Sequence, residues 1–549
     1  MNIFLDIIVF LVILGVIVMI HEFGHLIFAK MVNCLVREYS VGMGPKIVSK
    51  KFKEIEYSLR AFPLGGFCAI AGEIDEELLK GVDKVWLKFN KRSEVERIYT
   101  NSIKGITEEL KAYTLLSYDL VGKTKKDKTK KYERNLDIAG VTYNNLFVEV
   151  GSEERVETFK VVSDCQIVYA KNQTFQIAPR GRRLNDKRLR SQAFVMFGGP
   201  LFNFLLGFLV FFIAGIIIGS PVLTSNKIGE VTDESFAKKV LMMEKGDELT
   251  KINGSEIKGF KDIDSALQSF RDGTTNELEI EYKRQNQTIV KKANPYISVY
   301  TLGGITVQER DGKIFVLNAN SRIKQYKQGL KPGVEILKIN GNTITSWREF
   351  LKFFEGLEGN ENKEDNVLKL TILNEQKEEK EIEVNYFSRK LLKSLQGNTN
   401  YPMAKITLGV GAISKYKFGN GFITGFDLTI DSMGQVFKTI KLLFVSKEVG
   451  VGDLSGPIGI FSITQQIRKQ GFVAILRWVG LLSINIGLLN LFPIPALDGG
   501  RMLFVLYEGV ARRKPNKKVE TILITVTMLL LFGLIILISI KDIISIIGG

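Results

Sequence analysis

The stretch "VMIHEFGHLIFAK" (residues 18–30) places two histidines and a glutamate in a segment that otherwise has the composition of a membrane span. Upstream, the chain from residue 3 to residue 20 is almost purely apolar, and Asp6 is its only charge. His21 and His25 are the only two histidines among 549 residues, and positions four apart share one face of a helix. His-Glu-x-x-His therefore presents two imidazole nitrogens to a metal such as zinc and leaves Glu22 free as a base.

A match of five residues can also arise by chance in a long soluble protein. Inside an apolar segment that alternative is weaker, because unpaired ionisable groups are costly there and are usually functional. The cysteines Cys34, Cys68 and Cys165 show no metal-binding spacing, and we interpret them as structural.

Two histidines do not hold a catalytic zinc, and the chain has no third histidine. The best candidate for a third ligand lies in "SINIGLLNLFPIPALDGGR" (483–501), where an apolar helix breaks at two prolines before Asp498. A carboxylate on broken backbone at membrane depth needs a buried partner, and a metal would be one. The alternative is an interfacial turn acid, and for Asp498 considered alone that alternative is preferred.

The two segments together resemble the site-2 protease family of intramembrane zinc metalloproteases, in its bacterial PDZ-containing branch. The resemblance implies that His21, His25 and Asp498 bind zinc, that Glu22 activates water, and that Asn490 holds the substrate backbone. It rests on HEFGH (21–25), on N-x-x-P-x-P-x-L-D-G (490–499), and on VGMGPKI (41–47), YSLRAFPLGGF (57–67), FGGPLFN (197–203) and GDLSGPIGI (452–460) in that order.

The chemistry of such a site can be argued independently of the resemblance. Two histidines and one carboxylate leave a fourth position open to water, whose pKa zinc lowers to about 7. Glu22 can then take the proton while the metal polarises the scissile carbonyl. Hydrolysis within a bilayer further requires a polar cavity that admits water and a substrate helix that unwinds.

Hydropathy predicts about four membrane spans, near 3–27, 197–219, 472–492 and 519–540, each close to the roughly 20 residues needed to cross. The first lacks a basic leader and runs into the metal motif, so we expect it to be retained as a span. The segment 426–446 could be a fifth span, although its charges favour an interfacial amphipathic helix.

The distribution of basic residues predicts the orientation. "RGRRLNDKRLR" (180–190) and "ARRKPNKK" (511–518) flank spans, so the positive-inside rule places 30–196 and 499–518 in the cytosol and about 221–470 outside. The net charge of +16 needs no nucleic-acid partner, because anionic lipids attract basic residues at the inner face. We expect a multi-pass protein of the bacterial cytoplasmic membrane, with its active site near the cytosolic side.

The outer region contains an internal repeat. "GDELTKINGSEIKGF" (246–260) aligns with "GVEILKINGNTITSW" (333–347) at an offset of 87 residues, and each is followed by an amphipathic stretch and charged alternating segments. This order of strand, turn, helix and strands predicts tandem PDZ domains, which can bind an extended peptide at a sheet edge. Alternatively the repeats are spacers or size filters above the active site.

Two further segments lie between the first and second spans. Alternation in "EIEYSLRAF" predicts a strand that ends with a turn at residues 63–66, and the resemblance implies a membrane-reentrant hairpin that could capture substrate as an added strand. The alternative is an ordinary cytosolic hairpin. The stretch from about 75 to 180 departs from the family pattern and suggests a small β-rich unit without an assigned function.

The predicted fold is a polytopic α-helical membrane protein with about four transmembrane helices, a membrane-associated β-hairpin region and two extracytoplasmic α+β PDZ domains. The predicted segments are 1–30 (first span), 31–74 (reentrant β region), 75–182 (cytosolic insertion), 183–220 (second span), 221–298 and 299–395 (PDZ domains), 396–470 (interfacial helix region), 471–500 (third span) and 501–549 (basic turn and fourth span).

We expect a zinc-dependent intramembrane endopeptidase that cleaves transmembrane segments of single-span membrane proteins. By resemblance its substrates are anti-sigma factors or remnant signal peptides, and the sequence does not choose between them or indicate an oligomeric state. The main alternative is a membrane-anchored PDZ scaffold or chaperone with a vestigial metal site. Intact Glu22 argues against it, because a scaffold needs no base. A transporter with a structural metal is less well supported, since the spans show no internal repeat.

Overall fold

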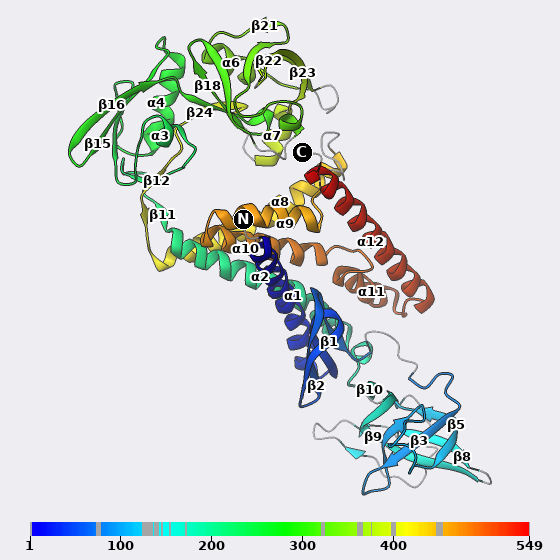
Figure 1. Cartoon of the computed structure of the whole chain (residues 1–549). Coiled ribbons are helices and arrows are strands. Elements are labelled where there is room, and N and C mark those ends of the chain that lie inside the picture. Colours follow the sequence, from blue (N-terminus) through cyan, green and yellow to red (C-terminus); the bar gives the residue numbers. More distant parts are fainter. Residues whose placement is uncertain are drawn as a thin grey trace. The chain divides into compact units, whose positions relative to one another are not determined.

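Among the residues that it describes, the computed structural model confirms four helices that are long and apolar enough to span a membrane, close to the positions that hydropathy predicts (Figure 1). They are α1 (Ile3–Met31), α2 (Leu189–Ile218), α10 (Phe472–Asn490) and α12 (Lys517–Ile547). The structure describes residues 3–72, 78–122, 135–136, 142–143, 146–152, 155–170, 173–319, 324–359, 366–374, 376–396, 402–445 and 454–547.

The chain forms two compact units. The first comprises residues 1–207 and 481–531, and the second comprises residues 208–480 and 532–549. Three of the long helices, α2, α10 and α12, therefore contribute to both units.

In the first unit, α1 and α2 approach each other at two glycines. A Cβ atom on Gly24 would overlap the carbonyl oxygen of Gly198, and one on Gly198 would lie 2.7 Å from the carbonyl oxygen of Gly24. Small residues at a helix crossing allow such backbone contact. The glycine inside HEFGH thus brings the histidine-bearing turn of α1 directly against α2.

A β region follows α1. Strands β1 (Val36–Phe52) and β2 (Ile55–Ile70) pair with irregular register, so that residues 38–41 lie opposite both residues 56–59 and residues 66–69. The turn predicted at residues 63–66 does not end the strand. It falls where β2 passes from one side of residues 38–41 to the other, and Pro63, which has no N–H to donate, falls in this unpaired stretch.

The insertion is a closed β-barrel. Its five strands pair in the order β9-β4-β3-β5-β8, and β8 pairs again with β9 to close the ring. Apolar side chains such as Val85, Ile98, Val148 and Ile167 are fully buried in its core. The strands are β3 (Lys84–Phe89), β4 (Val95–Tyr99), β5 (Ala112–Asp119), β8 (Phe147–Ser152) and β9 (Arg155–Ala170), with β10 (Gln173–Gln176) beside β9 and a short pair β6 (Asn135–Leu136) and β7 (Thr142–Tyr143).

The second unit contains the repeat that the sequence indicates. In both copies an Asn-Gly pair with positive φ forms a two-residue turn, at 253–254 and at 340–341. The first copy has β12 (Ile228–Val231), α3 (Phe236–Lys239), β13 (Glu248–Ile252), β14 (Ser255–Glu256), α4 (Lys261–Asp272), β15 (Leu278–Arg284) and β16 (Gln287–Ala293). The second has β17 (Tyr296–Val299), β18 (Ile305–Arg310), β19 (Lys313–Asn318), α5 (Lys324–Lys327), β20 (Glu335–Ile339), β21 (Asn342–Thr343), α6 (Trp347–Glu355), β22 (Val367–Leu373), β23 (Glu379–Asn385), α7 (Arg389–Gln396) and β24 (Ala404–Thr407).

The two copies are interleaved. Strand β25 (Val410–Ala412) follows the second copy but pairs with β12 of the first, so the first copy extends beyond the predicted boundary at residue 298. The next strand, β26 (Ser414–Lys415), pairs in the same way with β11 (Ser220–Pro221), which precedes the first copy. The rings of Phe270 on α4 and Trp347 on α6 stack at 5.2 Å, which joins the copies into one apolar core.

Two more helices belong to the second unit. In α8 (Phe418–Val445), which contains the segment considered as a fifth span, the Phe422 ring packs 4.8 Å from that of Phe212 on α2. It is not among the four candidate spans, and its relation to the membrane stays a prediction. The carboxylate of Asp542 on α12 accepts hydrogen bonds of 2.9 Å from the N–H groups of Gly456 and Gly459, at the start of α9 (Pro457–Lys469).

Candidate metal centre

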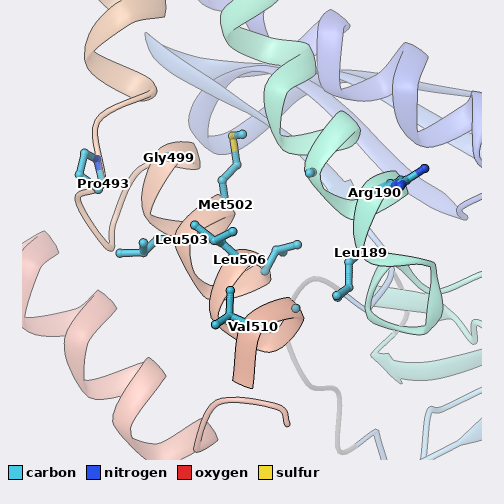
Figure 2. A pocket seen from close by; sticks show the side chains of 11 residues that line it. Leu189, Arg190, Pro493, Gly499, Met502, Leu503, Leu506 and Val510 are labelled. Atoms are coloured by element: carbon cyan, nitrogen blue, oxygen red, sulfur yellow. The ribbon is translucent and has the colours of Figure 1, made fainter. Parts of the chain in front are cut away.

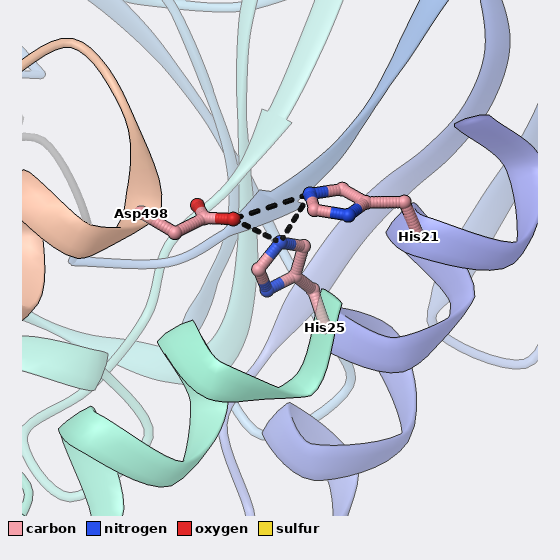
Figure 3. Close-up of side chains that lie close together, drawn as sticks. All are labelled: His21, His25 and Asp498. Carbon is pink, nitrogen blue, oxygen red and sulfur yellow. Dashed lines mark hydrogen bonds and ion pairs between the residues drawn. The ribbon is translucent and has the colours of Figure 1, made fainter. Parts of the chain in front are cut away.

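The three side chains that the sequence suggests as metal ligands meet in the first unit (Figure 3). His21 and His25 project from one face of α1, and Asp498 is the first residue of α11 (Asp498–Ala511). Oδ2 of Asp498 lies 3.1 Å from Nε2 of His21 and 3.4 Å from Nε2 of His25. The two Nε2 atoms are 3.3 Å apart, so the three ligand atoms converge on one point although 473 residues separate His25 from Asp498.

A hydrogen bond to Val195 shows that Nδ1 of His25 carries a proton. Its Nδ1 lies 2.8 Å from the backbone carbonyl of Val195, so Nδ1–H must donate to that oxygen. A neutral imidazole then turns the lone pair of Nε2 toward Asp498, whose buried Oδ2 accepts no hydrogen bond from any described residue. Lone pairs that face each other repel, and a cation between them removes the conflict. The donor set therefore fits zinc.

His21 is held from behind by Asn203 on α2. The Asn203 side chain is fully buried, and its Nδ2 lies 3.2 Å from Nδ1 of His21 while its Oδ1 has no partner among the described residues. The oxygen and nitrogen of an amide are assigned from such contacts. Exchanging them gives Nδ1–H of His21 an acceptor in Oδ1 of Asn203 and leaves Nε2 of His21 free to bind a metal.

Glycine is required where α2 passes the histidines. A Cβ atom on Gly199 would overlap Nε2 of His25 and would lie 2.7 Å from Nε2 of His21. Any side chain at this position would occupy the space that the metal needs. The Gly-Gly pair of FGGPLFN thus serves two purposes, since Gly198 allows the helix crossing and Gly199 keeps the ligand space open.

Glu22 lies on α1 beside the histidines and contacts the β region. Its carboxylate lies next to the backbone of Cys68 on β2. A Cβ atom on Gly66 would lie 3.3 Å from Cγ of Glu22, and the Tyr39 hydroxyl donates to the carbonyl of Met19 at 2.7 Å. The β region is therefore fastened to the helical turn that carries Glu22.

A tight turn presents Asp498. Residues 491–497 connect α10 to α11, and Leu497 precedes the first turn of α11. A Cβ atom on Gly499 would overlap the carbonyl oxygens of Leu491 and Phe492, and one on Gly500 would overlap that of Ile494. The two glycines after Asp498 are thus needed for the turn that brings the carboxylate to the histidines.

Asn490 is placed differently. It is the last residue of α10 and partly exposed, and its side chain makes no hydrogen bond with another residue in the part of the chain described. The amide that contacts His21 is that of Asn203, a residue without a predicted role. The sequence does carry a signal, because Asn203 is the only amide in the otherwise apolar stretch 197–219.

Comparison with known proteins shows the family of this chain. The model of peptidase family M50 matches residues 9–534. The chain belongs to peptidase family M50. Among its relatives are zinc metalloprotease RasP of Oceanobacillus iheyensis, 28% identical over 544 residues, and regulator of sigma-W protease RasP of Bacillus subtilis (strain 168), 26% identical over 540 residues. In both comparisons the match covers 98% of this chain and 98% of the relative.

The membership confirms the predicted site-2 protease resemblance and the enzyme class. This M50 peptidase is a zinc metalloprotease, and zinc is its cofactor. Its four long apolar helices agree with a membrane-embedded protein of this family.

Proposed function

We propose that this M50 peptidase hydrolyses peptide bonds in the transmembrane segments of single-span proteins of the bacterial cytoplasmic membrane. His21, His25 and Asp498 are the zinc ligands and Glu22 is the general base. The observation that carries the proposal is the convergence of three ligand atoms, all within 4.8 Å of one another, beside the turn of α1 that also bears Glu22. The zinc supplies Lewis acidity that acidifies water and polarises the scissile carbonyl.

The surrounding residues keep the ligands in their metal-binding form. Val195 fixes the tautomer of His25 through its carbonyl, and Asn203, with its amide oxygen and nitrogen exchanged, fixes that of His21. The Glu22 carboxylate lies between the histidines and the backbone of Cys68, where it can take a proton from water and pass it to the leaving amine.

Substrate presentation follows from the β region. The 66–69 stretch lies against α1 next to Glu22, and its outer edge pairs with no other described strand. An unwound substrate segment can add to this edge, exchanging its helical hydrogen bonds for ladder bonds close to the metal. Asn490, at the end of α10, is proposed as a further contact for the substrate backbone.

The substrate class is proposed from a relative. The Bacillus subtilis protein is named a regulator of sigma-W protease, which favours membrane-bound anti-sigma factors as substrates of this chain too. Remnant signal peptides are the second class, since they are also short single spans. The repeats at 221–298 and 299–395 are proposed as extracytoplasmic PDZ domains that filter or recruit substrates, with the metal near the cytosolic side.

The deciding experiment compares wild type with Glu22→Gln and Asp498→Ala in detergent. We expect Glu22→Gln to retain about one zinc per chain. Its cleavage of a single-span reporter should fall at least about 100-fold, because the general base is lost although the zinc ligands remain. Asp498→Ala should lose both zinc and cleavage. Zinc is measured by elemental mass spectrometry and cleavage by gel shift of the reporter.

A matched control removes a carboxylate elsewhere. Asp431→Asn changes an exposed acid on α8 and should keep wild-type zinc content and cleavage. Full cleavage by Glu22→Gln would contradict the assignment of the base. A wild-type chain with no zinc and no cleavage would favour the scaffold alternative, in which the metal motif is vestigial.

A further inference from the structure

A second site lies in the first unit, between the start of α2 and α11. A cavity of about 460 Å³ opens there; Leu189 of α2 lies opposite Leu506 and Val510 of α11, and Arg190 lies at its rim (Figure 2). Of the eleven residues that line it, ten are apolar or glycine and only Arg190 is charged. The volume is within the range of ligand-binding pockets.

The floor of the cavity depends on a glycine. A Cβ atom on Gly509 would lie 3.4 Å from Cδ1 of Leu189, so any larger side chain there would extend into the space between the helices. Met502, Leu506 and Gly509 recur at helical spacing and form one face of α11. Leu506 and Val510 are exposed by 61% and 79%. Exposing such an apolar helix face to water would be unfavourable.

The edge of the cavity is basic. The Arg190 guanidinium points away from the cavity at its rim, is exposed, and makes no hydrogen bond or ion pair with another described residue (Figure 2). The basic segment that follows α11 lies close to the start of α2, since the Lys514 ammonium donates to the backbone carbonyl of Asn185 at 3.2 Å. Residues 180–190 and 511–518 contain eleven Lys and Arg residues against one acid, Asp186.

We propose that this cavity binds an anionic diacyl phospholipid. One acyl chain fills the apolar space between α2 and α11, and the phosphate lies at the rim with Arg190 and the basic residues that flank it. Charge complementarity selects the occupant, because basic pockets beside membrane helices bind anionic head groups while an apolar cavity alone does not distinguish lipids. Arginine binds phosphate through a rigid fork of N–H donors.

The test uses full-length protein in detergent and a photoactivatable phosphatidylglycerol with a diazirine on its acyl chain. We expect cross-links to residues 499–510 or 189–193, located by peptide mass spectrometry. The matched phosphatidylcholine probe should label about fivefold less, which is the effect of one basic residue on an anionic head group.

Two variants distinguish the contribution of the lipid head group to labelling from that of the acyl chain. Arg190→Glu should lower phosphatidylglycerol labelling about fivefold and abolish the preference over phosphatidylcholine. Gly509→Leu should abolish labelling by both probes, since its side chain fills the cavity. The controls are Arg477→Glu, the same charge change at an exposed position of α10, and Gly533→Leu, at a glycine of α12 with no atom within 4 Å of an added Cβ; both should label like wild type.

Other outcomes would overturn the proposal. Equal labelling by the two probes would exclude selection of an anionic lipid, and full labelling of Gly509→Leu would exclude this cavity. Label displaced by a single-span substrate but not by excess unlabelled phosphatidylglycerol would assign the cavity to the substrate. None of these results depends on cleavage activity, so they are separate from the test of the proposed catalytic residues.

Discussion

At the scale of single residues, the metal centre depends on partners that orient the histidines as much as on the ligands themselves. An imidazole binds metal through one nitrogen only if the other carries the proton, and an acceptor decides which nitrogen that is. For His25 the acceptor is a backbone carbonyl, which no substitution of Val195 removes. For His21 it is the Asn203 side chain, so this half of the arrangement can be tested by mutation.

Replacing Asn203 should change zinc affinity according to whether an acceptor remains. Asn203→Leu leaves Nδ1–H of His21 without a partner, and we expect zinc affinity to fall about 10- to 100-fold in chelator competition. Asn203→Asp keeps an acceptor oxygen and should bind zinc nearly as wild type does.

Ser483→Ala is the control for the Asn203 series. It removes a buried hydroxyl that donates to the Asn203 backbone carbonyl at 2.8 Å but leaves the contact with His21 in place. It should retain zinc. Equal zinc affinity in Asn203→Leu and Asn203→Asp would show that the amide only fills space.

Gly199→Ala should lose zinc while the helices remain folded. The added methyl group would occupy the space beside Nε2 of both histidines, and the close contact of the Gly24 and Gly198 backbones limits how far α2 can shift. Zinc per chain by elemental analysis checks this. Gly15→Ala, on α1 with no atom within 4 Å of the new Cβ, is the control. Wild-type zinc content in Gly199→Ala would contradict the close approach of α2.

At the scale of elements, the β region is fixed at both ends. Near α1 it is held by Tyr39 and by the contact between Cys68 and Glu22. At the turn between β1 and β2, the Glu54 carboxylate accepts two hydrogen bonds, of 2.8 and 2.7 Å, from the Arg182 guanidinium. The segment that leads into α2 therefore holds the turn, and a strand proposed to present substrate stays in place beside the metal.

The Glu54–Arg182 pair should make the β1–β2 turn sensitive to pH. The hydrogen bond from Arg182 holds the pKa of Glu54 below its ordinary value, so the stabilisation is present above that ordinary value and is lost as pH falls through the lowered pKa. Because the Glu54 side chain is 41% exposed, the pair contributes about 1 kcal/mol or less.

Hydrogen exchange of residues 50–57, corrected for intrinsic rates, measures this effect. Wild type should lose protection at the turn as pH falls below the ordinary pKa of glutamate, while Glu54→Gln should show weak protection at every pH. Glu108→Gln, at an exposed position of the barrel unit, should behave like wild type. Equal pH dependence in wild type and Glu54→Gln would assign the effect to other groups.

At the scale of the whole molecule, the two repeats of the second unit are nested. The second copy begins at β17 and ends at β24, and these strands pair so that Tyr296 lies opposite Thr407. Its two ends are therefore adjacent, as they are in domains that tolerate excision. The first copy instead depends on β25, which the chain reaches only after completing the second copy.

Excision should therefore affect the two copies unequally. Deleting 296–407 joins two adjacent backbone positions and should leave residues 222–293 resistant to protease, with reduced stability because Phe270 loses its stacking on Trp347. Deleting 221–298 should leave β25 without β12. Limited proteolysis with mass spectrometry distinguishes the two, and zinc content serves as the control for the rest of the chain. Rapid digestion of 222–293 in the first variant would contradict the nested arrangement.

The sequence by itself determined the four long helices, the two histidines on one helical face, the aspartate that joins them and the repeat of 87 residues. Each is a local signal, because an apolar run, a spacing of four or an Asn-Gly turn constrains only the residues that carry it. Only the tertiary structure decided that Asn203 supports His21, that residues 38–41 pair twice, that the insertion closes into a barrel and that β25 returns to β12. These contacts join residues from about 18 to more than 180 positions apart, and no local periodicity encodes which distant partner a strand edge or a buried amide meets.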